Sequence, residues 1–344
     1  MVSRLQPILL SGSQDAFARA YDASQALPVD ESRLAPEGWE PPRYAATISR
    51  PAEVEGPATY HRGRLRRLAF LPAPRGMATG WVVDRVDLPE QLPIPMTLGS
   101  VCRADRAIVL RSGVDANRFR MSEHVICHRL GLGIDNIRIE TDSEDPPLFD
   151  EGSMPIVRAL LDAGLAEDTT QELRYISPSS PVVLMHPSNG GFLLWEPARD
   201  GSRILRLDVS IDFPNAIGQE RVVLDLHPDA FIHGAVARTN CSAYEMRKAR
   251  LFGWLSPEIK NLGYTRENIL LAGKKVYVNE PKLLTPAGKS LEPVWHRTCL
   301  DLVAALSLMP PGCRPAGKIT SFKSGHVLDV RFLTLLFHKG LIAS

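Results

Sequence analysis

Short segments of alternating apolar and polar residues occupy much of the first half of the chain. Alternation with a period of two is typical of strands that bury one face. It predicts strands at residues 44–48, 65–71, 80–86, 106–111 and 137–141. Helical spacing of apolar residues predicts a helix at 122–130, with Ser122 as its N-cap, and another at 154–163, ended by Gly164.

The second half repeats this order of elements. The pattern predicts strands at 182–186, 191–196, 204–211 and 220–225, a helical region at 228–262, one or two strands within 269–278, a helix at 294–308, a strand at 319–324 and a helix at 327–339. Strands that gather before helices in each half favour an α+β fold over a parallel α/β sheet. We expect two similar layered domains, each with a sheet packed on helices.

The chain has 344 residues, enough for two domains of ordinary size. We place domain I at 45–170 and domain II at 171–344. Residues 1–44 are rich in Pro, Ser and Ala and lack a clear period. They are expected to form an N-terminal extension that packs on the surface or is partly disordered.

Charge and cysteine content narrow the class of protein. Lys plus Arg number 40 and Asp plus Glu 39, so no global charge favours nucleic acid or an anionic membrane, and the basic residues at 62–67 are interpreted as a solvated strand face. No stretch approaches the roughly 18 apolar residues of a membrane-spanning helix. Five cysteines without a CxxC pair argue for a reducing, cytoplasmic location. A monomer is compatible with the sequence, which does not settle the oligomeric state.

Three groups of residues could carry chemistry. His124 and His128 are one helical turn apart and could face one metal, with Glu123 beside it as a base; buried structural histidines are the alternative. His296 and Asp301 supply further zinc-type ligands, or else a salt-bridged helix. The third group is the motif Lys-Ser-Gly-His at 323–326. Its histidine lies at a strand-to-helix turn and could act as a general acid.

Taken together, these pieces resemble one family, the UDP-3-O-acyl-N-acetylglucosamine deacetylases of lipid A synthesis. The resemblance runs from about Ala45 to about Leu341. The family motif Val-Glu-His, followed by Gly-Leu-Gly-Ile-Asp-Asn, corresponds to Ser-Glu-His at 122–124 and the same six residues at 131–136. Further matches are Tyr-His-Arg-Gly at 60–63, Pro-Leu-Phe-Asp at 147–150, Gly-Ser at 152–153, and Lys-Ser-Gly-His-Val-Leu at 323–328.

The resemblance implies an enzyme with two α+β domains, a site between them and a zinc cofactor. Glu123 would be the general base, and His326 would stabilise the oxyanion and protonate the leaving amine. The implied zinc ligands are His124, His296 and Asp301. Substrate-binding candidates are Lys323 and Arg297, for phosphate or sugar, together with His61 and Thr239.

The spacing of the second histidine and the aspartate departs from the family pattern, in which they lie four residues apart. His296 and Asp301 are five apart, which turns an ideal helix by about 140° and separates their side chains. We predict a π-bulge within 297–300 that restores the register. The alternative is that His128 replaces one ligand.

Two further departures concern the carboxylate beside the general acid and the threonine that helps hold the oxyanion. Ala305 stands where the family has the aspartate that partners the general acid, so the pKa of His326 is expected to fall unless another carboxylate, such as Asp329, replaces it. The family's Ala-Arg-Thr-Phe-Gly-Phe, whose threonine helps hold the oxyanion, resembles both 237–239 and 249–254. We favour the second segment, which leaves Thr239 a secondary candidate.

The functional expectation is zinc-dependent hydrolysis of an N-acyl amide, N-acetyl in the family, on an amino-sugar conjugate such as UDP-3-O-acyl-N-acetylglucosamine. Its partner would be this small molecule, with no nucleic acid. Two alternatives are the same chemistry on an amide outside lipid A, and a non-catalytic relative that binds a nucleotide sugar or a protein.

Overall fold

The first half of the chain folds around a five-stranded sheet in the order β4-β5-β11-β6-β7. The computed structural model describes residues 6–61, 63–199, 201–252 and 263–342. The strands of this sheet are β4 (Ala52–Pro57), β5 (Leu65–Pro72), β6 (Trp81–Arg85), β7 (Ile94–Pro95) and β11 (Ile137–Thr141). Two smaller sheets pair β3 (Tyr44–Ile48) with β12 (Leu165–Glu172), and β8 (Val101–Arg103) and β10 (Arg118–Phe119) with β9 (Val109–Arg111).

The second half builds a larger, seven-stranded sheet in the order β1-β14-β15-β21-β16-β17-β2. Its strands are β1 (Ile8–Ser11), β2 (Glu31–Arg33), β14 (Val182–Met185), β15 (Phe192–Glu196), β16 (Leu205–Phe213), β17 (Gly218–Asp225) and β21 (Gly317–Phe322). Two small parallel sheets have two strands each. One pairs β13 (Arg174–Ile176) with β20 (Cys313–Pro315), and the other pairs β18 (Thr239–Ser242) with β19 (Ile269–Ala272).

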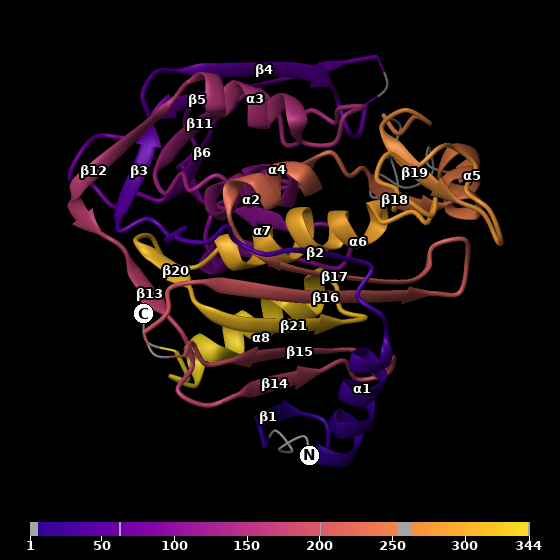
Figure 1. Ribbon diagram of the computed structural model, residues 1–344. Coiled ribbons are helices and arrows are strands. Elements are labelled where there is room, and N and C mark those ends of the chain that lie inside the picture. Colours follow the sequence, from indigo (N-terminus) through magenta and orange to yellow (C-terminus); the bar gives the residue numbers. More distant parts are fainter. Residues whose placement is uncertain (1–5, 62, 200, 253–262, 343–344) are drawn as a thin grey trace.

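Helices from both halves lie between the two large sheets (Figure 1). They are α2 (Glu123–Gly131), α4 (Pro228–Ala235), α6 (Glu292–His296), the π-helical segment η2 (Arg297–Leu302) and α7 (Val303–Ser307). Around them lie α3 (Met154–Asp162), α8 (His326–His338), α5 (Ala243–Phe252) and the 3₁₀ turn η1 (Leu98–Ser100). One hydrophobic core runs through this helical layer and the inner faces of both sheets.

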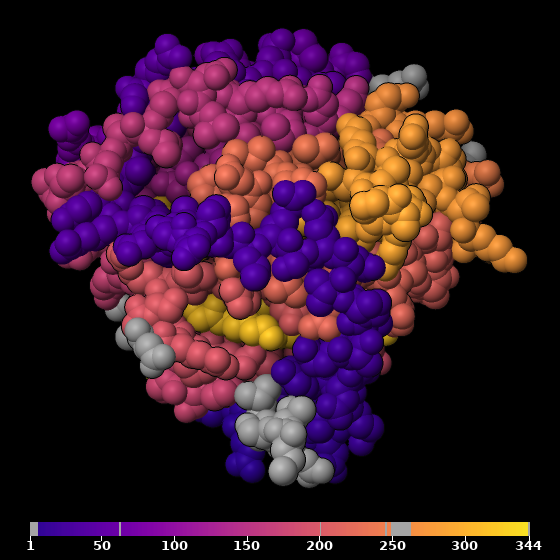
Figure 2. All heavy atoms as spheres, viewed as in Figure 1, coloured from indigo at the N-terminus to yellow at the C-terminus, as the bar shows by residue number. Residues whose placement is uncertain are grey.

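The N-terminal extension is part of the larger sheet. Its strand β1 pairs in parallel with β14 at one edge, and β2 pairs in parallel with β17 at the other. Between them, α1 (Gln14–Ala26) covers the sheet face that points away from the helical layer. In Figure 2 the indigo N-terminal segment crosses the face of the molecule between the two halves. The described part of the extension therefore packs on the rest of the protein, which was one of the two expectations; the other was partial disorder.

Alternation along β14 and β15 explains how that sheet buries both faces. Val182 and Leu184 point into the main core, whereas Val183 and Met185 pack under α1. Successive side chains of a strand point to opposite faces, so an unbroken apolar run is what a doubly covered sheet requires.

The α+β class is confirmed, and most expected strands and helices are found within a few residues of their predicted positions. The helical region expected at 228–262 is wrong in part, because the strand β18 separates α4 from α5; its residues 253–262 lie outside the described residues. The predicted domain boundaries, at 45 and 171, stay a prediction. In the parts of the chain described, no helix is long and apolar enough to cross a bilayer.

Candidate active site

Glu123 lies at the start of α2 with its carboxylate held against the neighbouring strand segment. Its Oε2 accepts the backbone N–H of Ile108 at 2.8 Å, and its side chain is buried. Ser122 does not cap the helix as expected; its hydroxyl donates to the Ile108 carbonyl at 2.9 Å. Burial raises the pKa of Glu123, against the opposing charge of His326. A carboxylate of raised pKa is a better proton acceptor near neutral pH.

His124 and His296 meet across the two helices α2 and α6. Their ring centroids are 5.5 Å apart. The hydroxyl oxygen of Thr239 lies 3.3 Å from His124 Nε2 and 3.1 Å from His296 Nε2. Burial, and then the charge of His296, lower the pKa of His124 to about 3, so its imidazole is neutral at physiological pH. Thr239 therefore lies between the two imidazoles. The preference for residues 249–254 as the oxyanion segment stays a prediction, because Gly253 and Trp254 lie outside the described residues.

The π-bulge predicted between His296 and Asp301 is confirmed. Residues Arg297–Leu302 form the π-helical segment η2, between α6 and α7. Its wider turn brings Asp301 Oδ1 to 3.4 Å from His296 Nδ1, although five residues separate the two in sequence. A single extra residue in a helix is commonly accommodated in this way at functional sites.

His326 begins α8 and faces both carboxylates of the site. Its Nε2 lies 3.9 Å from Glu123 Oε1 and 3.6 Å from Asp301 Oδ1. Burial lowers the pKa of His326, but the charges of Asp301, Glu123 and Asp329 outweigh it and raise that pKa above its ordinary value. Of the two outcomes expected for this histidine, replacement of the missing carboxylate by Asp329 is the one found, and Ala305 is buried in the hydrophobic core.

Arg297 forms its hydrogen bonds within the protein through one nitrogen, Nη2. Its Nη2 donates to Asp329 Oδ1 at 2.6 Å and to Ser324 Oγ at 2.6 Å, and the residue is only 5% exposed. It therefore ties η2 to the loop and helix that carry His326. Its Nε and Nη1 are buried and donate no hydrogen bond within the described residues, so contact of Arg297 with a substrate phosphate or sugar stays a prediction.

The remaining candidates lie outside the cluster of Glu123 and its partners. His128 is buried, its Nδ1 lies 2.9 Å from the Val125 carbonyl oxygen and its ring packs on Phe231. Within the described residues no contact joins it to His296 or Asp301, so replacement of a ligand by His128 is not supported. Lys323 is partly exposed and its Nζ donates to Asp212 Oδ2 at 3.1 Å. His61 is exposed.

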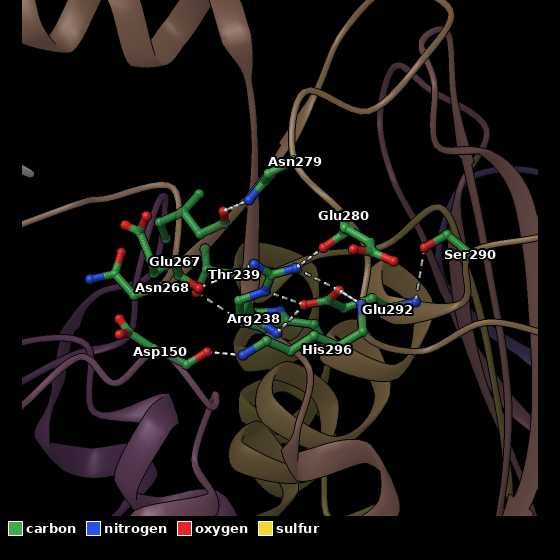
Figure 3. Close-up of polar contacts among 12 residues, drawn as sticks. Asp150, Arg238, Thr239, Glu267, Asn268, Asn279, Glu280, Ser290, Glu292 and His296 are labelled. Atoms are coloured by element: carbon green, nitrogen blue, oxygen red, sulfur yellow. Dashed lines mark hydrogen bonds and ion pairs between the residues drawn. The ribbon is translucent and has the colours of Figure 1, made fainter.

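A buried ion pair that the sequence analysis missed positions Thr239. Arg238 Nε donates to Glu292 Oε1 at 2.7 Å, and the Arg238 backbone N–H donates to the same oxygen at 2.9 Å (Figure 3). Glu292 opens the helix that ends in His296. The pair therefore fixes β18 against α6 and places Thr239 beside His296. The only signal in the sequence was an acidic residue followed by Pro293, typical of a helix start.

The donor set at this site suits zinc in chemical type. Two imidazoles and a carboxylate with room for water are typical of hydrolytic zinc sites. Asp301 Oδ1 is buried and accepts no hydrogen bond within the described residues. Burial raises the pKa of Asp301, but the charges of His326 and His296 outweigh it and lower that pKa below its ordinary value. Among the residues described, no three His, Cys, Asp or Glu side chains already stand at metal-binding separations. The donors fit in kind, and binding requires them to draw together.

Comparison with known proteins agrees with this arrangement. The sequence profile of the LpxC family, described as UDP-3-O-acyl N-acetylglycosamine deacetylase, matches residues 45–338. The chain belongs to the LpxC family. Three relatives named UDP-3-O-acyl-N-acetylglucosamine deacetylase come from Solibacter usitatus (26% identical, covering 83% of this chain and 88% of the relative), Idiomarina loihiensis (31%, 80% and 84%) and Myxococcus xanthus (29%, 82% and 83%). The match begins at the end of the N-terminal extension, so the LpxC profile does not include β1, α1 and β2.

Proposed function

We propose that this LpxC-family protein hydrolyses the N-acetyl amide of a UDP-3-O-acyl-N-acetylglucosamine, with zinc as its cofactor. The observation that carries the proposal is the facing pair of Glu123 and His326, 3.9 Å apart beside His124, His296 and Asp301. The printed names of the relatives support the choice of substrate.

Amide hydrolysis requires one group to accept a proton and another to supply one. Glu123, a buried carboxylate of raised pKa, would take the proton of the attacking water. His326, whose pKa is raised by the surrounding carboxylates despite its burial, would give a proton to the leaving amine. The products are acetate, the free amine and one proton. Glu123 then releases to solvent the proton that it took from water, and His326 regains the one that it gave.

The remaining residues would hold the metal and the polar oxygen of the amide. His124, His296 and Asp301 would be the zinc ligands. When bound, zinc acts as a Lewis acid that polarises the amide carbonyl and lowers the pKa of water. Thr239, between the two imidazoles, offers a hydroxyl to the carbonyl oxygen as negative charge develops there. Cysteines that form no disulfide, among them Cys127, Cys299 and Cys313, support a cytoplasmic setting for this reaction.

The test combines metal analysis with acetate release from UDP-3-O-acyl-N-acetylglucosamine. We expect about one zinc per chain, and a fall in kcat of roughly 100-fold or more in Glu123→Gln without loss of zinc. Glu151→Gln, which changes an exposed carboxylate, is the matched control and should leave kcat unchanged.

Unchanged hydrolysis in Glu123→Gln, or full activity in protein free of metal, would overturn the mechanism. Acetate release only from another N-acetylated compound would retain the chemistry and overturn the substrate.

A further inference from the structure

A cavity of about 320 Å³ lies between the two halves of the molecule, apart from the candidate active site. The first half lines it with the end of α2 and with β3 and β12, and the second half with β13, β20 and the start of α4. Leu130 on its lining follows Glu123 by seven residues on α2, which is about 10 Å along the helix. Its volume is that of a small-molecule site.

The N-terminal extension forms one wall of this interdomain cavity. Trp39, Pro41 and Pro42 line it, and Tyr175 Oη donates to the Pro42 carbonyl at 2.6 Å. Figure 2 shows the indigo extension where it crosses between the two halves. The LpxC profile begins at residue 45, so a segment outside the family match completes the cavity.

Most of the lining is apolar or aromatic. Leu132 and Leu205 are buried side chains on the lining, and Trp39, Tyr44 and Tyr175 add aromatic rings. Aromatic rings and leucines are the usual lining of small-molecule sites, and flat rings pack well against them. The lining therefore fits a ligand with a planar apolar body.

One buried polar atom on the lining lacks a partner. His227 is only 7% exposed, and its Nε2 forms no hydrogen bond within the described residues. The ring lies beside Trp39, with ring centroids 5.7 Å apart. A buried donor without a partner is unfavourable, so an oxygen atom of a ligand would be stabilised there.

Two buried arginines beside the cavity share a single carboxylate. Arg314 lines the cavity and donates to Asp135 through Nε at 3.0 Å and Nη2 at 2.9 Å. Arg129 directly precedes Leu130, and its hydrogen bonds within the described residues go to backbone carbonyls. Burial lowers the pKa of Arg129 to about 10, so it is still charged at neutral pH. One buried positive charge is therefore left without a carboxylate partner within the described residues.

The acidic groups near the cavity are exposed. Glu167 lies on its rim, and Glu40, whose side chain is 79% exposed, pairs with Arg203 at 3.1 Å. Water and salt screen such charges more than buried ones, and exposed ion pairs contribute little to stability. A ligand carboxylate can therefore take the place of Glu40 at small cost.

We propose that the interdomain cavity binds a small carboxylic acid with a planar apolar ring. The ring would lie among Trp39, Tyr44 and Tyr175, and the carboxylate would accept a hydrogen bond from His227 and face Arg203. This site goes beyond the proposed function and does not depend on it.

Calorimetry with three probes tests the chemical class of the ligand. We expect 2-naphthoate to bind with a Kd of about 1 mM or below. The neutral analogue 2-naphthalenemethanol should bind about tenfold more weakly, and acetate, which lacks the ring, should not bind measurably. Equal affinity for the acid and the alcohol would overturn the anionic class. Absence of 2-naphthoate binding at about 5 mM would overturn the site.

Variants of the lining test its location. His227→Phe should weaken 2-naphthoate binding by about tenfold, and Arg203→Gln by roughly three- to tenfold. Arg203 is partly exposed, so its replacement should not disturb packing. Arg138→Gln is the matched control, since Arg138 forms an exposed pair with Asp84 away from the lining. Unchanged affinity in both lining variants would overturn the inference.

One further variant separates this cavity from the catalytic centre. Glu123→Gln should bind 2-naphthoate as the parent protein does. Binding lost in Glu123→Gln but kept in His227→Phe and Arg203→Gln would place the acid at the catalytic centre and overturn the inference. Binding that depends on His227, in a protein that releases no acetate, contradicts the proposed function alone.

Discussion

Thr239 shows how one hydroxyl can connect the two halves of a reaction centre. Its oxygen touches the imidazoles of His124 on α2 and His296 on α6. The buried pair of Arg238 and Glu292 holds it there. An oxygen so placed can donate to a carbonyl oxygen as charge develops, and donors of this kind contribute more to kcat than to substrate binding.

Thr239→Val should therefore lower kcat by about 10- to 100-fold with a smaller change in KM. The isosteric change removes the hydroxyl and keeps the shape of the side chain. Thr169→Val, at an exposed position on β12, is the control. Steady-state acetate release checks the outcome, and an unchanged kcat in Thr239→Val would count against the role of the hydroxyl.

Glu220 is a buried carboxyl whose titration affects folding. Its Oε2 accepts the Val294 N–H at 3.0 Å at the start of α6, and burial raises its pKa to about 8. A carboxyl with a higher pKa in the folded protein binds more protons when folded. Its favourable contribution is complete below its ordinary pKa of 4.5 and is lost as the pH rises to about 8.

Across that interval Glu220 should lower the free energy of unfolding by up to about 5 kcal/mol. Glu220→Gln keeps the hydrogen-bond acceptor for Val294 and removes the titration. Between pH 5 and pH 8 the free energy of unfolding should therefore fall less in this variant than in the parent protein, by an amount on the order of 5 kcal/mol. Urea unfolding at several pH values provides the measurement. Parallel pH profiles for the two proteins would show that Glu220 does not titrate in this range.

At the scale of elements, the helix that carries His296 and Asp301 is the clearest case of local geometry that brings candidate site residues together. The π-helical turn of η2 accommodates one residue more than an α-helix would hold between His296 and Asp301. The helix resumes as α7, whose Ala304 and Ala305 are fully buried. The extra residue is thus confined to the turn between the two candidate ligands.

Deleting Thr298 should convert this turn into regular α-helix and leave the flanking residues in place. We expect zinc content to be retained and stability to change by no more than about 2 kcal/mol. Deleting Ala304 instead rotates every later residue of the helix by about 100° and should lower stability by more than about 3 kcal/mol. Metal analysis and urea unfolding distinguish the two, and equal damage by both deletions would contradict a local bulge.

At the scale of the whole molecule, the N-terminal extension joins opposite edges of the larger sheet. It also contacts the helix that carries His296, because Glu31 accepts the indole N–H of Trp295 at 2.9 Å. Phe17 on α1 packs against Phe192, with ring centroids 5.4 Å apart. These contacts make the extension part of the same folded unit as His296.

Phe17→Ala should therefore lower the free energy of unfolding by about 3–5 kcal/mol in a single cooperative transition. Phe213→Ala is the matched control, since Phe213 is 41% exposed, and it should cost less than about 1 kcal/mol. Denaturant unfolding followed by tryptophan fluorescence measures both. A separate early transition in Phe17→Ala, with the main one unchanged, would mean that the extension folds independently.

The sequence by itself determined the fold class, most strands and helices, and most residues of the candidate site. Periodicity reports which side of an element is buried, so it located β14, β15 and α3 well. The motifs around Glu123 and His326 are local, and the five-residue spacing of His296 and Asp301 was enough to predict the π-bulge. Periodicity, local motifs and residue spacing all depend on residues that are close together in the sequence.

Only the tertiary structure decided which distant groups meet. Thr239 was a secondary candidate because two segments resembled the same motif, and only the structure shows that its hydroxyl lies 3.1 Å from His296 Nε2. The raised pKa of His326 depends on carboxylates from three helical segments. Charge interactions act through space over a few ångströms, so their strength follows from packing between elements and not from order along the chain.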